Sequence, residues 1–182
     1  SPPQPLLLIR GDYEETREQE PNQDRATAGE LLVKSTVNGR FESPGDEDWY
    51  RLTLSKEQSV VIHTLAQRHL RAPADTFIEV YDATGKQLAE NDDAAQFMGQ
   101  VWHDFESQDS RQAFTAPADG DYYVRVRDQT GAASPQAVYR LSVEPYGPDF
   151  AVFQWPDAVP VWGPGSTAAF VTQVFAWGGL KS

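Results

Sequence analysis

Short segments in which apolar and polar residues alternate constrain the fold of this chain more than any other feature. Residues 75–93 show the pattern most clearly, with Ile78 and Val80 separated by residues of a different character. Side chains alternate between the two faces of a β-strand, so these two residues would face a core while their neighbours line a half-covered face. The Asp and Gly within residues 82–85 favour a tight turn. The stretch is therefore predicted to form a β-hairpin.

The same alternation recurs along the chain between turn signals. It appears in residues 36–42, 48–54, 59–65, 110–115, 121–127 and 138–143. The connections are too short for crossover helices, which favours antiparallel pairing. Regularly spaced short strands of this kind indicate a β-sandwich. We therefore predict an all-β, antiparallel sandwich over residues 30–146, with no long helix.

The two ends of the chain differ in composition from this central part. Residues 1–29 are proline-bearing and then acidic, without an apolar face, and we interpret them as a linker that is ordered only when its carboxylates are neutralised. Residues 147–182 are rich in aromatic residues and poor in charge, with strands expected at 149–155 and 167–177. Two or three strands do not make a stable sandwich alone. This extension therefore either packs on the sandwich or begins a second β-domain.

Composition disfavours several classes of function. The formal net charge of −12 weighs against nucleic acid or an anionic membrane as partner, and it is compatible with divalent cations and with a secreted protein. The absence of cysteine excludes disulfides, thiolate metal sites and cysteine nucleophiles. No apolar run approaches the ~20 residues of a membrane helix, so membrane insertion is not expected. If the protein is exported, we expect its signal segment to have been removed.

Several motifs in order along the chain carry a family resemblance. They lie at residues 18–22, 37–41, 45–50, 78–82, 89–93, 109–110 and 118–126. Together they resemble the bacterial pre-peptidase C-terminal domain, and they are similar to the collagen-binding modules of clostridial collagenases. The resemblance implies a jelly-roll-like β-sandwich that serves as a non-catalytic accessory domain of a larger secreted or cell-surface protein. Residues after 148 show a weaker resemblance to the start of an immunoglobulin-like domain.

The resemblance also implies a calcium site. Carried over by motif, its ligands would be Glu18, Glu20, Asn22, Asp46 and Asp48. Calcium prefers six to eight oxygen ligands from carboxylates, amides and carbonyls, which suits this set. The alternative interpretation is a solvated acidic linker in which Asp48 caps a turn.

A second group of oxygen-bearing side chains is a weaker candidate for a metal site. It comprises Asn91, Asp92, Asp93 and Asp109, which would meet if the loop between them folds back. The alternative is that these residues satisfy their own backbone through Asx turns.

Nothing in the sequence predicts catalysis. A hydrolase needs a nucleophile, a base and an orienting acid, and the only histidines are His63, His69 and His103. The chain has neither a Gly-x-Ser-x-Gly nucleophile elbow nor a His-Glu-x-x-His zinc motif. We therefore predict that this chain is not an enzyme.

Three functional hypotheses remain open at this stage. The first is an accessory module that links or presents neighbouring domains of its parent chain, stiffened by calcium. The second is a binding module for an extracellular polysaccharide or fibrous protein, for which Tyr81, Tyr123 and Tyr139 are candidate surface aromatics. The third is a segment removed during secretion or maturation. An unpaired apolar edge strand would also allow the chain to dimerise.

Overall fold

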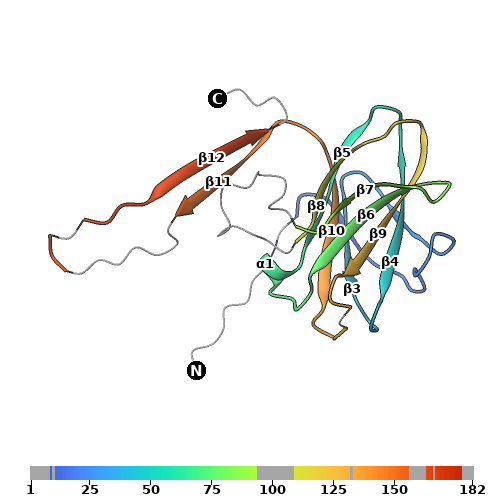
Figure 1. The fold of residues 1–182 in the computed structure, drawn as a ribbon, viewed down its shortest axis with the longest axis horizontal. Coiled ribbons are helices and arrows are strands. Elements are labelled where there is room, and N and C mark those ends of the chain that lie inside the picture. The colour runs from blue at the N-terminus through green and yellow to red at the C-terminus, as the bar shows by residue number, and fades with distance from the viewer. Residues whose placement is uncertain are drawn as a thin grey trace. The chain divides into compact units, whose positions relative to one another are not determined.

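The computed structural model describes residues 9, 11–93, 109–131, 133–155, 163–165 and 167–177. It divides the chain into two compact units, Ser1–Pro145 and Tyr146–Ser182. The first unit is built almost entirely from strands, which form two stacked sheets (Figure 1). The prediction of an all-β sandwich is confirmed.

Each sheet has five strands. In spatial order, the first sheet consists of β1 (Glu14–Arg17), β3 (Ser35–Arg40), β10 (Val138–Pro145), β5 (Ser59–Leu65) and β8 (Arg111–Thr115). The second consists of β2 (Gly29–Leu31), β4 (Glu47–Leu54), β9 (Gly120–Asp128), β6 (Thr76–Asp82) and β7 (Gln87–Asn91). A single helical turn, α1 (Gln67–Leu70), follows β5.

The core lies between the two sheets and follows the predicted alternation. Ile78 and Val80 of the β6–β7 hairpin are fully buried, and the hairpin has the expected bounds. Leu52 of β4, in the same sheet, is also fully buried, and Ile62 and Leu141 of the first sheet belong to the same core cluster. The period-two pattern therefore identified the inward face of the strands correctly.

Two strand pairs at the sheet edges are parallel, whereas the other pairs of the sandwich are antiparallel. β1 pairs with β3, and β2 pairs with β4, in each case in the same direction. The chain alternates between the sheets over its first four strands, so the strands that meet in one sheet are separated by a strand of the other. Such pairs need no tight hairpin, and the rule that short connections give antiparallel pairs does not apply to them.

Residues 14–17, which we expected to belong to a linker, form strand β1. Its register runs from Glu14 opposite Ser35 to Arg17 opposite Asn38. The carboxylate of Glu15 accepts a hydrogen bond from Nη2 of Arg140 at 2.8 Å. The acidic segment is thus ordered by strand pairing and by a cation from β10, and neither partner is visible in the local sequence.

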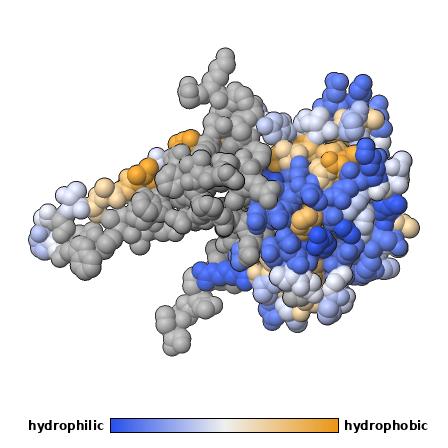
Figure 2. All heavy atoms as spheres, viewed as in Figure 1, coloured by the Kyte–Doolittle hydropathy of each residue, from blue (hydrophilic) through white to orange (hydrophobic). Residues whose placement is uncertain are grey.

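The second unit contains a two-stranded antiparallel ladder. β11 (Asp149–Trp155) pairs with β12 (Val171–Trp177), and β12 begins later than the sequence suggested. The large apolar side chains of Phe150, Phe170 and Val174 are exposed. Figure 2 shows hydrophobic residues in orange along this unit. Among the described residues of the whole chain, no helix is both long and apolar enough to cross a membrane. The immunoglobulin-like start stays a prediction.

Candidate metal centre

The segment of residues 18–22 joins the two sheets of the sandwich. At its start, the backbone N–H of Glu18 donates to the carbonyl oxygen of Asn38 on β3 at 3.1 Å. At its end, the carbonyl oxygen of Asn22 accepts a hydrogen bond from the N–H of Trp49 on β4 at 2.8 Å. The segment is therefore fixed at one end to the first sheet and at the other to the second.

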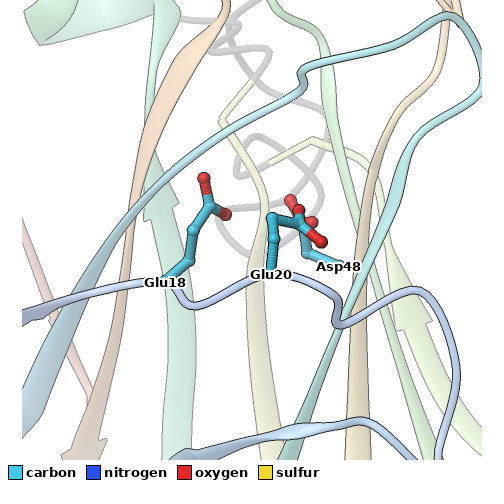
Figure 3. A group of neighbouring side chains, drawn as sticks. All are labelled: Glu18, Glu20 and Asp48. Atoms are coloured by element: carbon cyan, nitrogen blue, oxygen red, sulfur yellow. The ribbon is translucent and has the colours of Figure 1, made fainter.

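Three carboxylates meet where this segment passes β4. Glu18, Glu20 and Asp48 each offer an oxygen, and these oxygens lie within 4.8 Å of one another. Figure 3 shows the carboxylates of Glu20 and Asp48 next to each other, with that of Glu18 on the same side of the segment. Glu18 and Glu20 alternate along an extended stretch, which directs both side chains to one side. Asp48 is fully buried at the start of β4.

Each carboxylate is held by at least one hydrogen bond. Oε1 of Glu18 accepts the backbone N–H of Arg40 at 2.7 Å, and Oε2 of Glu20 accepts that of Asn22 at 3.0 Å. Oδ2 of Asp48 accepts the hydroxyl of Tyr139 at 2.6 Å. The other oxygen, Oδ1 of Asp48, is buried and has no hydrogen-bond partner.

The electrostatics of the cluster are unfavourable for three bare anions. Burial raises the pKa of Asp48 to about 8, opposed by the Tyr139 hydrogen bond and reinforced by the charge of Glu18. Burial likewise raises the pKa of Glu18 to about 7, reinforced by the charge of Glu20. Within the described part of the chain, none of the three carboxylates forms a salt bridge with a lysine, arginine or histidine. The cluster thus carries acidic groups that lack a compensating cation.

Asn22 adds an independent sign that the cluster takes a ligand. Its side chain is fully buried, and neither the amide oxygen nor the amide nitrogen has a hydrogen-bond partner. Buried polar groups in proteins are almost always satisfied, so an orphaned amide next to a carboxylate cluster requires an explanation. Calcium–oxygen distances of about 2.3–2.6 Å place two ligands on opposite sides of an ion about 5 Å apart. The spacing of the carboxylate oxygens fits that requirement.

Asp46, the fifth ligand expected from the sequence, has a partly structural role. It is buried, and its Oδ2 accepts the backbone N–H of Glu42 at 2.7 Å. Its charge contributes to the raised pKa of Asp48, yet it is not part of the group of three converging carboxylates.

The second candidate set is engaged in local structure. Oδ1 of Asp109 accepts the backbone N–H groups of Ala66 and Gln67 at 3.0 and 2.8 Å. Oδ1 of Asn91 accepts the N–H of Arg111 at 2.8 Å, and its amide nitrogen donates to the carbonyl of Asp93. Oδ2 of Asp92 accepts a hydrogen bond from Nε2 of Gln129 at 3.0 Å. Metal binding by this set stays a prediction.

The sequence analysis missed the role of Tyr139. We considered it a candidate surface aromatic, but it is fully buried and contacts the carboxylate cluster. The sequence contained a sign of this, because Tyr139, Leu141 and Val143 occupy alternate positions of β10 and so lie on the same face of the strand. Leu141 and Val143 face the core. Tyr81 and Tyr123 are half-buried on the outer face of the second sheet.

Comparisons with known proteins show a match to one family of domains. The family model of the bacterial pre-peptidase C-terminal domain matches residues 46–128. The resemblance predicted from the motifs is confirmed over these residues. The matched range includes Asp46 and Asp48 and ends before β10, and it does not include the segment of residues 18–22.

The similarity to known proteins covers about two thirds of this chain. A probable subtilase-type serine protease of Deinococcus radiodurans is 30% identical over 131 residues, which cover 68% of this chain and 16% of that protein. The pre-peptidase C-terminal domain of a Bacillus anthracis collagenase is 16% identical, with a TM-score of 0.47 over 69% of this chain and 99% of that one. A periplasmic inhibitor of g-type lysozyme from Aeromonas hydrophila is 12% identical, with a TM-score of 0.40 over 64% and 96% of the two chains.

Proposed function

We propose that this chain is a non-catalytic accessory module of a larger secreted or cell-surface protein, and that a calcium ion fastens its N-terminal segment to the sandwich. The observation that carries the proposal is the convergence of Glu18, Glu20 and Asp48 within 4.8 Å, without a cationic partner in the described structure. The orphaned amide of Asn22 supports it.

The ion would act by neutralising charge and by joining two sheets. Glu18 is bonded to the first sheet and Asp48 belongs to the second, so a cation shared by them bridges the sandwich at this end. Without the ion, two backbone hydrogen bonds and the contacts of the Glu18 carboxylate with Arg40 and Tyr139 hold residues 18–22 against the mutual repulsion of the carboxylates. Occupation of the site would therefore stiffen the path by which the chain enters the sandwich.

Two observations support a non-catalytic role. Among the described residues, the only group of three or more converging acidic, histidine or cysteine side chains is the carboxylate cluster itself. His63 on β5 has its pKa lowered to about 4 by burial and by the charge of Arg111, which makes it a weak base. The other two histidines of the sequence analysis lie at positions whose side chains are outside the described structure.

The comparison with the Deinococcus protein supports an accessory position within a longer chain. This chain spans 16% of that relative, which is named as a probable protease. Neighbouring domains of a parent chain are therefore the partners that we propose. Among the described large apolar side chains of the first unit, only that of Leu32 is exposed. A polymer-binding face and an edge-strand dimer stay predictions.

Calorimetry on protein stripped of metal with EDTA tests the proposal. We expect calcium to bind and to raise the melting temperature, because a ligand at 100 times its Kd stabilises the folded state by about 2.7 kcal/mol, or roughly 5–10 °C. The double variant Glu20→Ala and Asp48→Ala should abolish both effects.

A matched control distinguishes binding at this cluster from nonspecific binding of calcium to other carboxylates of the chain. Glu30→Gln removes an exposed carboxylate from β2 of the same sandwich and should leave calcium binding unchanged. Absence of heat with the unaltered protein would refute the calcium site. An unchanged rise in melting temperature in the double variant would place the ion elsewhere.

A further inference from the structure

The hydroxyl of Tyr139 lies at the inner end of the carboxylate cluster. The residue belongs to the central part of the first sheet, and its side chain is fully buried. The hydroxyl donates to Oδ2 of Asp48 at 2.6 Å and lies 3.3 Å from Oε2 of Glu18. It is also 2.6 Å from the hydroxyl of Tyr50, which is buried on β4. One phenol from the first sheet thus contacts acidic groups of both the N-terminal segment and the second sheet.

The direction of these hydrogen bonds follows from the number of protons. A tyrosine hydroxyl has one proton to donate, and an ionised carboxylate can only accept. When Asp48 is ionised, as it must be to bind a cation, the proton of Tyr139 is committed to that carboxylate. The proton between the two phenols must then come from Tyr50. The result is a directed chain from Tyr50 through Tyr139 to Asp48, in which each bond polarises the next.

Gly39 provides the space in which this contact forms. It is the ladder partner of Tyr139 on the neighbouring strand β3. A Cβ at this position would lie 2.3 Å from Cζ of Tyr139, 2.4 Å from its hydroxyl oxygen and 2.7 Å from Oε2 of Glu18. Any other residue would therefore displace the phenol, the Glu18 carboxylate or both.

We propose that Tyr139 is the positioning residue of the metal site, which fixes Asp48 through Oδ2 so that the unpartnered Oδ1 faces the cation, and that Gly39 makes this contact possible. The inference rests on the proposed function and deepens it. It assigns no contact between Tyr139 and the ion. Partners of metal ligands orient them, and their loss typically weakens metal affinity about 10–100-fold.

The decisive comparison is Tyr139→Phe against Tyr50→Phe, with calcium binding measured by calorimetry on EDTA-stripped protein. Each variant deletes one hydroxyl from the same buried pair and keeps the ring, so both lose the bond between the phenols. Only Tyr139→Phe releases the Asp48 carboxylate. We expect calcium affinity to fall about 10–100-fold in Tyr139→Phe and to stay within about threefold in Tyr50→Phe.

A second pair of variants tests the same contact while keeping every hydroxyl and carboxylate. Gly39→Ala should weaken calcium binding by displacing the phenol, the Glu18 carboxylate or both, and unchanged affinity would overturn the role assigned to Gly39. Gly29→Ala on β2 is its control, because a Cβ there would come no closer than 3.4 Å to the ring of Tyr50, an ordinary contact. This pair also gives an answer if Tyr139→Phe does not fold.

The outcomes separate the inference from the function on which it rests. If the unaltered protein does not bind calcium, the proposed function is overturned and the inference with it. If the unaltered protein binds and Tyr139→Phe binds equally well, the inference alone is overturned. Equal losses in Tyr139→Phe and Tyr50→Phe would also overturn it, since they would show a general effect of the buried pair. Urea unfolding of each metal-free variant measures that general effect independently.

Discussion

Replacing Asp48 by Asn should stabilise the metal-free protein while removing its response to calcium. Burial raises the pKa of Asp48 from its ordinary value of 3.8 to about 8, so at pH 7 the folded state keeps a proton that the unfolded state releases. One pH unit corresponds to about 1.4 kcal/mol, so holding this proton lowers the free energy of unfolding at pH 7 by about 4 kcal/mol. An Asn avoids this cost, but its buried NH2 group lacks an acceptor, at a penalty of about 1–3 kcal/mol. The net gain is about 1–3 kcal/mol.

The pH dependence gives this prediction a second, independent readout. Because the pKa of Asp48 is higher in the folded state, the free energy of unfolding falls as pH rises from about 4 through about 8. The advantage of Asp48→Asn should therefore shrink by about 3 kcal/mol between pH 7 and pH 5. Urea unfolding in EDTA at both pH values measures it. A variant less stable than the unaltered protein at pH 7, or an advantage that does not change with pH, would refute the electrostatic reasoning.

Three further predictions concern residues outside the metal site. Burial lowers the pKa of His63 to about 4, so the free energy of unfolding should fall by up to about 3 kcal/mol between pH 6.5 and pH 4, and urea unfolding of His63→Gln should show a correspondingly smaller fall. Glu79→Gln should lose about 2–3 kcal/mol of unfolding free energy, because this nearly buried carboxylate forms a salt bridge with Arg125 at 2.6 Å. Glu42→Gln, which breaks the exposed salt bridge with Arg40, should lose less than about 1 kcal/mol in the same assay. Asp109→Ala should lose about 1–2 kcal/mol of stability in thermal melting, because two backbone hydrogen bonds are lost, and Asp109→Asn should lose less because it keeps an acceptor. Neither variant should change calcium binding. A loss of calcium binding would instead favour a metal at that position.

The sequence predicted the strands of the sandwich other than β1 and β2, because the information for these strands is local. Alternation with a period of two indicates the buried face of a strand, and it placed Ile78 and Val80 in the core correctly. The Asp and Gly of residues 82–85 likewise predicted the β6–β7 turn, where Oδ1 of Asp82 accepts the N–H of Thr84 at 2.8 Å. Chemistry confined to four or five consecutive residues is readable without knowledge of the fold.

The metal-site residues were named from a resemblance, and the structure decided how they meet. Glu18 and Glu20 are separated from Asp48 by two strands in sequence, and they converge because residues 18–22 cross from one sheet to the other. The pairing of β1 with β3 was also not predictable, because the two strands are separated in sequence and nothing near residues 14–17 indicates their partner. Local composition alone indicated a linker.

Tertiary structure also decided which polar groups are structural. The side-chain oxygens of Asp109 and Asn91 accept hydrogen bonds from backbone N–H groups far away in the sequence, whereas Oδ1 of Asp48 has no hydrogen-bond partner. The sequence by itself determined the class of fold, because side-chain periodicity and turn chemistry act over a few residues. Only the folded chain determined that Tyr139 contacts Asp48 and that Gly39 leaves room for it, because such contacts depend on strand register and on the packing of one sheet against the other.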